Sequence, residues 1–198
     1  MKDHPGTTIS KLFLTLAIAL AVVGMRGTAS AQYDDVFRVN YFANNVSGAP
    51  DATVRIDNTG LAGGNLCAMI YVFDNDQQLT ECCGCLTTPD GLATLSVKKD
   101  LTSNPLTGVV SNNGVIEVVA SELNGYPCDP TYDVLPTPEL RVWGTHVQNK
   151  VGSAYPVTET EFSDSFLSGV ELYNLQTDCS FVHLLGSGHG QCTCGTGD

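Results

Sequence analysis

The chain of 198 residues is poor in positive charge, with 9 Lys+Arg against 21 Asp+Glu, and charged residues make up only 15% of it. Proteins that bind nucleic acid or anionic membranes cluster lysine and arginine to neutralise phosphates, so this balance argues against both partners. No apolar run reaches the roughly 20 residues that span a bilayer. The His-Glu-x-x-His zinc motif and the phosphate-binding Walker loop are also absent, which argues against two common classes of enzyme.

The first residues have the pattern of a secretory signal peptide. Two lysines precede a charge-free apolar run of 13 residues at 12–24, and Ala-Ser-Ala at 29–31 is the small-x-small site that signal peptidase reads. We expect residues 1–31 to be cleaved off before Gln32; a membrane anchor or a buried helix is the alternative. A glutamine rather than a cysteine after the cut argues against lipid anchoring.

Cleavage would yield a secreted, extracellular chain of residues 32–198 that is still more acidic. The leader removes three basic residues and one acidic residue, which leaves 6 Lys+Arg against 20 Asp+Glu. Such a chain is long enough for one buried core, and its charge repels its own copies weakly. Any self-association must therefore come from backbone pairing or from burial of apolar side chains.

All eight cysteines follow the predicted cleavage site. An even number in an exported chain indicates four disulfides, with 105 possible pairings. Adjacent cysteines at 82 and 83 are expected to pair elsewhere, because a bond between neighbours strains the backbone. We expect bridges between the clusters at 82–85 and 192–194, which would tie the tail to the body. The predicted disulfide residues are Cys67, Cys82, Cys83, Cys85, Cys128, Cys179, Cys192 and Cys194.

A metal site is the alternative for part of this set. His189 and the cysteines at 82–85 and 192–194 offer nitrogen and sulfur ligands, but their spacings match structural zinc knuckles poorly. The acidic stretch at 74–76 resembles the start of a calcium loop, yet Leu79 and Cys85 stand where that loop needs glycine and glutamate. We therefore expect no metal and no cofactor.

Segments with strong β-propensity, separated by turns, dominate the mature chain. Residues 65–72 are almost continuously apolar, which predicts a central strand buried on both faces. The turn at 74–76 and the segment 77–83 would bring the chain back as a hairpin. Further strands are predicted at 34–43, 53–56, 91–98, 115–120, 139–147 and 155–162, with a proline-rich loop at 122–138.

One helix is predicted near the C-terminus. Ser168 and Glu171 fit a capping box, apolar residues then recur at helical spacing, and Gly186 is expected to end the helix. About eight strands and one helix indicate a mostly β protein. We predict a single disulfide-stapled, jelly-roll-like β-sandwich over residues 47–198, preceded by an N-terminal strand at 32–46.

Few residues carry a pattern typical of catalysis. Glu159 and Glu161 would share one strand face, and paired carboxylates can hydrolyse glycosides across a cleft, but such a pair is expected by chance in an acidic chain. His146 is more typical of a packed strand residue than of a base. Trp143 could stack on a sugar, but a lone tryptophan usually belongs to a core. We expect no catalytic residue.

The N-terminal strand is the most informative segment. It is apolar, it directly follows the predicted cleavage site, and a linker with Gly48 and Pro50 comes after it. It could pair within its own domain, or it could cross to a neighbouring subunit and complete that subunit's sheet. The residues predicted to link subunits are Val36, Phe37, Val39, Tyr41 and Phe42, of which Phe37, Val39 and Tyr41 would fill apolar slots on one face.

Three stretches resemble those of uncharacterised secreted bacterial proteins that are cysteine-rich β-sandwiches. They are Asn-Leu-Cys-Ala-Met-Ile-Tyr-Val-Phe-Asp at 65–74, Gln-Gln-Leu-Thr-Glu-Cys-Cys-Gly-Cys at 77–85 and Cys-Thr-Cys-Gly at 192–195. The likeness covers most of the mature chain. The general pattern also resembles subunits of environmental extracellular filaments, in which an N-terminal strand links β-rich protomers. Neither resemblance implies a catalytic residue.

These observations favour a secreted, non-enzymatic subunit whose partner is another copy of itself. We expect it to self-assemble into a cell-surface filament by head-to-tail strand complementation, without membrane contact after cleavage. The alternative is an extracellular carbohydrate-binding module or adhesin that recognises surface glycans through Trp143. A small hydrolase that uses Glu159 or Glu161 is the third hypothesis.

Overall fold

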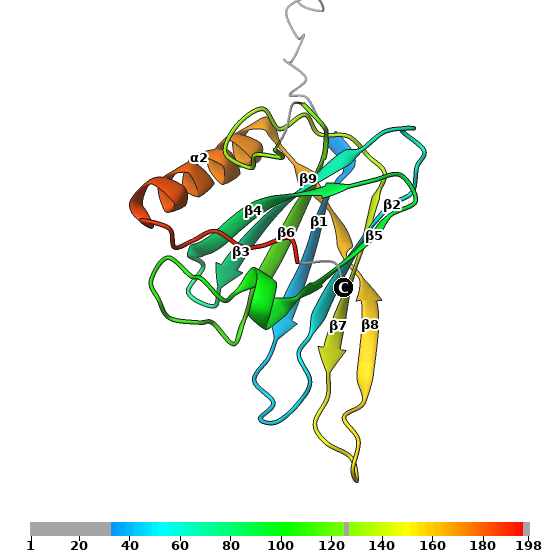
Figure 1. Ribbon diagram of the computed structural model, residues 1–198, viewed down its shortest axis with the longest axis vertical. Coiled ribbons are helices and arrows are strands. Elements are labelled where there is room, and N and C mark those ends of the chain that lie inside the picture. Colours follow the sequence, from blue (N-terminus) through cyan, green and yellow to red (C-terminus); the bar gives the residue numbers. More distant parts are fainter. Residues whose placement is uncertain (1–32, 125–126, 196–198) are drawn as a thin grey trace, which may run out of the picture. The chain divides into compact units, whose positions relative to one another are not determined.

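Two antiparallel β-sheets and one long helix make up the part of the chain that the structure describes. The computed structural model describes residues 33–124 and 127–195; the predicted signal peptide at 1–31 and its cleavage site lie outside them. The larger sheet has the strand order β4-β3-β6-β1-β9 and the smaller sheet β5-β2-β7-β8 (Figure 1). The elements are β1 (Tyr33–Ala43), β2 (Thr53–Asn58), β3 (Leu66–Asp74), β4 (Leu79–Thr87), β5 (Leu92–Ser96), the π-helical turn η1 (Val97–Leu101), β6 (Asn113–Glu122), β7 (Leu140–Val147), β8 (Val157–Glu161), β9 (Ser163–Leu167) and α2 (Gly169–Leu185).

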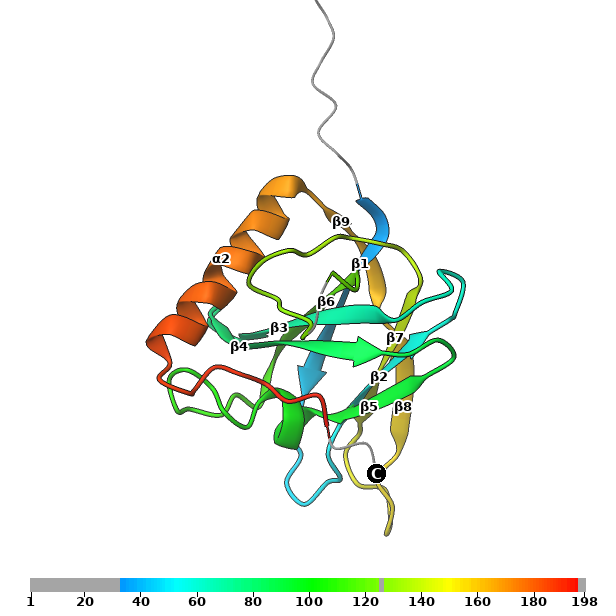
Figure 2. The same ribbon diagram turned by 45° about the horizontal axis from the view of Figure 1, so that its top comes forward.

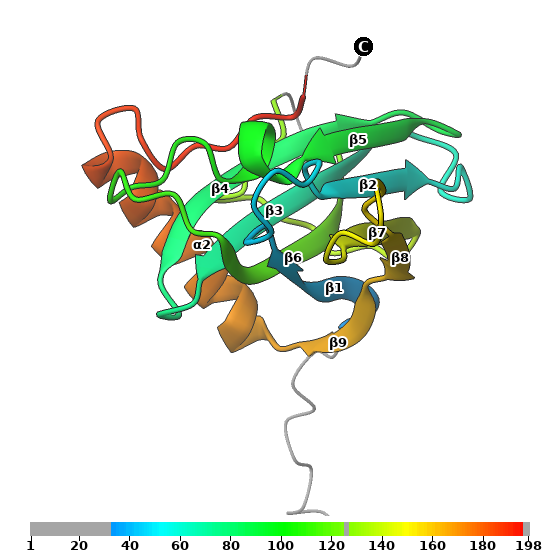
Figure 3. The same ribbon diagram turned by 90° about the horizontal axis from the view of Figure 1, so that it is seen from below.

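The two sheets face each other and α2 covers the other face of the larger sheet, which gives three layers (Figure 3). The core between the sheets includes Ile56, Ile70 and Val118. A second core, between the larger sheet and α2, includes Tyr71 and Leu175. β3 contributes alternate residues to both cores, because side chains along a strand point to opposite faces. This arrangement confirms the predicted β-sandwich with a C-terminal helix, and it explains the continuous apolar sequence of β3.

The helix begins and ends where its sequence predicts. The Ser168 hydroxyl accepts a hydrogen bond from the Glu171 N–H at 3.0 Å, as in the predicted capping box. The Gly186 N–H donates to the carbonyl of Val182 at 2.9 Å. A Cβ at Gly186 would lie 2.0 Å from the His189 carbonyl oxygen, so only glycine lets the chain turn back there. None of the described helices is both long and apolar enough to cross a membrane.

The chain between 157 and 167 forms one edge of both sheets. β8 pairs with β7 in the smaller sheet, and β9 pairs with β1 in the larger sheet. Phe162 joins them and is buried between the sheets, 3.1 Å from where a Cβ would stand on Gly144, so a glycine at 144 makes room for the ring. The sequence predicted a single strand at 155–162 and missed β9. The predicted strand at 91–98 also ends earlier, at Ser96, where η1 begins.

Candidate functional site

The first strand lies inside the larger sheet, hydrogen-bonded on both sides. β1 pairs antiparallel with β6 along one edge and with β9 along the other. Phe37, for example, stands opposite Val119 on β6 and Ser165 on β9. We call the space between β6 and β9 the β1 seat. In this structure the strand therefore pairs within its own chain, which is one of the two arrangements that the sequence left open.

Four of the five predicted linking residues pack into the domain. Val36, Phe37 and Phe42 are buried and Val39 is half-buried. A bulge near Asp35, whose φ is 58°, places both Val36 and Phe37 in the helix-side core although they are neighbours in sequence.

The fifth residue, Tyr41, corrects the sequence prediction. It fills no apolar slot: it is 61% exposed, and its ring stacks on His146 with the centroids 4.5 Å apart. The helix-side core takes side chains from β1 up to Val39, so the face that Phe37, Val39 and Tyr41 were expected to share is covered over only part of its length. His146 is buried in β7, and burial lowers its pKa.

An ion pair between a buried arginine and an exposed aspartate holds β1 against β9. Arg38 is 4% exposed and pairs with Asp164, which stands directly opposite on β9. Burial, followed by the nearby Arg141, lowers the pKa of Arg38, yet an arginine stays charged at physiological pH. The sequence reading missed this pair; its signal was a lone basic residue inside a strand of high β-propensity.

The other two arginines of the described chain hold β8 in the same way. Arg55 pairs with Glu159 and Arg141 pairs with Glu161. All four side chains are substantially exposed on the open face of the smaller sheet. The two glutamates thus balance positive charge on β2 and on β7. This role accounts for their spacing without catalysis.

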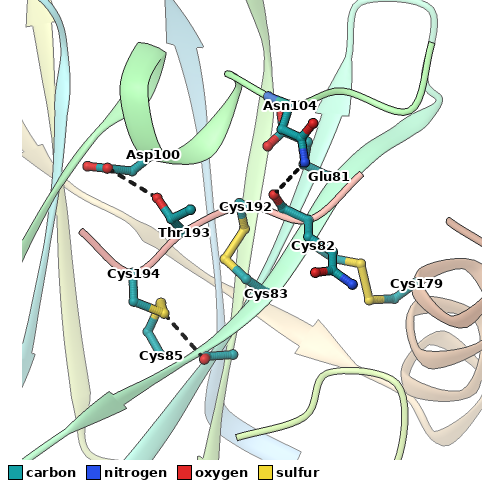
Figure 4. Close-up of a disulfide and its surroundings, with 12 residues drawn as sticks. Glu81, Cys82, Cys83, Cys85, Asp100, Asn104, Cys179, Cys192, Thr193 and Cys194 are labelled. Carbon is teal, nitrogen blue, oxygen red and sulfur yellow. Dashed lines mark hydrogen bonds between the residues drawn. A yellow bond between two sulfur atoms is a disulfide. The ribbon is translucent and has the colours of Figure 1, made fainter. Parts of the chain in front are cut away.

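Three disulfides connect the larger sheet to α2 and the C-terminal tail (Figure 4), and a fourth connects β3 to the loop that precedes β7. The bonds are Cys67–Cys128, Cys82–Cys179, Cys83–Cys192 and Cys85–Cys194. The last two join residues separated by the same 109 positions, so the tail runs parallel to β4. The Cys82 N–H donates to the Gly190 carbonyl at 3.0 Å, so the tail also covers the edge of β4 with backbone pairing. This confirms that bridges join the two cysteine clusters and that Cys82 and Cys83 pair elsewhere.

The same sulfurs stand close enough together to suggest metal sites. Cys82 and Cys179 lie near His183, whose Nε2 is 3.3 Å from the Cys82 sulfur, and Cys83, Cys85 and Cys194 form a second group. Every one of these sulfurs is in a disulfide, so none offers the thiolate that a metal binds. In the oxidised protein these groups are crosslinks.

A buried carboxylic acid fixes the path of the tail. Glu81 is fully buried on β4, and its Oε1 accepts the Asn104 N–H at 2.9 Å, while its Oε2 has no hydrogen-bond partner among the described residues. Asn104 in turn donates to the tail carbonyls of Gly188, at 2.8 Å, and Gln191. Burial raises the pKa of Glu81 to about 7. Figure 4 shows Glu81 and Asn104 beside the tail.

Trp143 lies on the outer face of the smaller sheet and not in a core. The inward residues of β7 are Leu140, Val142, Gly144 and His146, and Trp143 belongs to the alternate set that faces away. It is half-buried and stands opposite Arg55 in the strand register. The expectation that a lone tryptophan belongs to a core is therefore wrong here.

Comparison with known proteins gives no family. No family model and no curated protein matches the sequence. Among solved structures, a crystal structure of Thermotoga maritima 1070 is similar over 69% of this chain and 96% of that chain, with 13% identity and a TM-score of 0.41. The function must therefore be argued from the residues of this chain.

Proposed function

We propose that the mature protein is a secreted, non-catalytic structural subunit that polymerises head to tail, with β1 of one subunit occupying the β1 seat of the next. One observation carries the proposal: none of the four disulfides involves β1, whereas the elements that support its seat, β3 beside β6 and α2 after β9, are each crosslinked to the rest of the domain. The strand is therefore free to exchange while the seat persists. Multiple disulfides are also typical of extracellular proteins.

The two walls are held by different crosslinks. β6 pairs with β3, which carries the Cys67–Cys128 bond. β9 leads directly into α2, which the Cys82–Cys179 bond holds against β4. Each such crosslink restricts the unfolded chain and typically stabilises the fold by about 2–4 kcal/mol. This framework would keep the seat in place in a subunit whose own strand has left it.

Exchange of β1 between subunits preserves the contacts of the strand. Burial of Val36, Phe37 and Phe42 is worth roughly 1.5–3 kcal/mol for each side chain, and it is the same whether the seat belongs to the same chain or to a neighbour. The equilibrium between pairing within one chain and exchange between chains then depends on protein concentration and on the connection at 44–52. A head-to-tail exchange is heterologous, so it grows into a fibre unless its rotation closes a ring.

The first test is negative-stain electron microscopy of the export-matured protein, with size-exclusion chromatography on the same sample. Regular filaments are expected, and protein that lacks residues 32–46 should stay folded without forming them. A monomer at micromolar concentration would contradict the proposal, as would filaments that persist after the deletion.

The ion pair between β1 and β9 allows a sharper test, because it distinguishes exchange between chains from pairing within one chain. Arg38→Asp places two carboxylates together in the seat, and Asp164→Arg places two guanidinium groups together, so neither variant should polymerise alone. In a mixture, the β1 carboxylate of the first variant meets the β9 guanidinium of the second, while the unchanged Arg38 and Asp164 form the reciprocal pair. Filaments that form only in the mixture are expected; if pairing is confined to one chain, mixing rescues nothing.

A second candidate function follows from the position of Trp143. A half-buried tryptophan on an open sheet face, with arginine and glutamate side chains around it, is a surface on which a carbohydrate-binding module could stack a sugar ring. Loss of glycan binding in a folded Trp143→Ala variant would support this alternative.

A further inference from the structure

A groove runs between α2 and the loop that precedes β7. The groove is open to solvent and has a volume of about 610 Å³, within the range of small-ligand sites. The loop and α2 lie side by side over the larger sheet (Figure 2). Residues 131–133 of the loop form one wall, and α2 residues between Tyr173 and Leu184 form the other.

A crosslink and several hydrogen bonds fix the loop wall of the groove. The Cys67–Cys128 bond fixes its start, and the Tyr71 hydroxyl donates to the Pro130 carbonyl at 2.9 Å from within the core. The Asp129 carboxylate accepts from both the backbone N–H and the hydroxyl of Thr131, at 2.8 and 2.6 Å. These contacts hold the next residue along, Tyr132, at the rim of the groove.

The helical wall is crosslinked as well. The Cys82–Cys179 bond ties the middle of α2 to β4, and Leu175 and Val182 are buried beneath the helix. Two of the four disulfides thus support the two walls of one groove. A site that is already held in its binding shape does not lose affinity to ordering when its ligand arrives.

Three aromatic side chains that line the groove are exposed. Tyr132, Tyr173 and Phe181 are 58%, 67% and 56% exposed. A soluble protein rarely exposes large apolar side chains together unless the surface binds something. The rings line the groove together with the hydroxyl and amide groups of Thr177, Ser180 and Gln176, so the groove is mainly apolar and carries a few hydrogen-bonding groups.

The charge of the groove narrows the class of ligand. Among the described residues, no lysine, arginine or histidine lines it, and Asp133 is its one carboxylate, which disfavours phosphorylated, sulfated or carboxylated ligands. The hydroxyl and amide groups disfavour a purely apolar ligand, because they would lose water without gaining a partner. A neutral sugar has an apolar C–H face for the rings and hydroxyls for the amide, hydroxyl and carboxylate groups.

We propose that the groove between α2 and the 129–134 loop binds a neutral oligosaccharide, with Tyr132, Tyr173 and Phe181 as stacking platforms. Gln176, Thr177 and Asp133 fix the sugar hydroxyls. This site is on the opposite side of the larger sheet from Trp143, and it requires no polymerisation. A filament subunit with such a groove would display it on every copy.

The test is isothermal titration calorimetry on the mature, disulfide-bonded protein with soluble cello-, xylo- and chito-oligosaccharides, and with oligogalacturonate as the anionic comparison. Binding of at least one neutral series is expected, with little or none of the anionic series. Tyr173→Ala and Phe181→Ala should each weaken binding at least about tenfold, because each removes one stacking face. Both side chains are more than half exposed, so the variants should fold, which circular dichroism and thermal melting check.

Val170→Ala is the matched control, because Val170 is exposed on the same helix but does not line the groove, and it should bind like the parent. Trp143→Ala should also leave binding unchanged; a loss there with none in Tyr173→Ala would overturn the groove site in favour of the sheet face. Preference for the anionic series, or no binding to any neutral series, would overturn the proposal too. So would sedimentation data in which Tyr173→Ala abolishes self-association, because the helix face would then be an interface between copies.

Discussion

Two buried glutamates determine how the stability of the fold depends on pH. Glu81 and Glu117 both have a buried carboxylate oxygen without a hydrogen-bond partner in the described part of the chain, and burial raises the pKa of each to about 7. The folded state therefore holds protons that the unfolded state has already released. Stability should fall as pH rises from about 4.5, the usual value for glutamate, to about 7, and should change little from these groups above that.

Glu81→Gln should make the free energy of unfolding depend less steeply on pH. The amide oxygen still accepts from the Asn104 N–H, but the cost of an ionised buried group disappears, which amounts to roughly 3 kcal/mol at most. We expect the variant to be more stable than the parent at pH 8 and to lose the advantage below pH 5, with part of the slope left because Glu117 is unchanged. Chemical denaturation at several pH values measures this, with the exposed Glu122→Gln as control. An unaltered slope in Glu81→Gln would show that Glu81 is ionised in the folded protein.

At the scale of elements, the continuous apolar run at 65–72 predicted β3, and the capping residues Ser168 and Gly186 predicted where α2 begins and ends. Sequence reasoning missed β9, because the strand is only five residues long and its first three, Ser-Asp-Ser at 163–165, are polar and typical of a turn. That edge is held by backbone pairing and by ion pairs such as Arg38–Asp164, which join residues far apart in the sequence. Sequence reasoning did not predict the groove either, because its two walls come together only through crosslinks whose pairing the sequence left open.

The connection between β1 and β2 is the element on which strand exchange depends. The Asn44 side chain accepts the Ala52 N–H at 3.1 Å and donates to Asp51 at 3.0 Å, which closes the loop. Asn44→Ala leaves the buried Ala52 N–H without a partner, at a cost of about 1–3 kcal/mol. We expect a lower urea midpoint and, under the proposed function, faster growth of light scattering. Asn45→Ala, at an exposed neighbour, should change neither; slower assembly in Asn44→Ala would mean that the closed loop is the assembling form.

At the scale of the whole molecule, the four crosslinks overlap. Cys83–Cys192 and Cys85–Cys194 each span 109 positions, and a lone crosslink over about 100 residues would stabilise the fold by about 4.7 kcal/mol. With one of the two present, however, the other closes an effective loop of only a few residues. With both absent, the Cys82–Cys179 bond still restrains the chain, so restoring either one closes an effective loop of roughly 15 residues, worth about 3 kcal/mol.

The two tail bonds should therefore be non-additive. Replacing either pair by alanine should cost about 2 kcal/mol or less, and replacing both about 5 kcal/mol, well below the roughly 9 kcal/mol of two independent crosslinks. Urea unfolding of the two double variants and the quadruple variant gives these values. Loss of Cys67–Cys128, which spans 61 positions and has no parallel partner, should by itself cost about 4 kcal/mol. If loss of either tail bond alone also costs about 4 kcal/mol, the tail and β4 are independent in the unfolded chain. Each of the two tail bonds would then stabilise the fold in its own right.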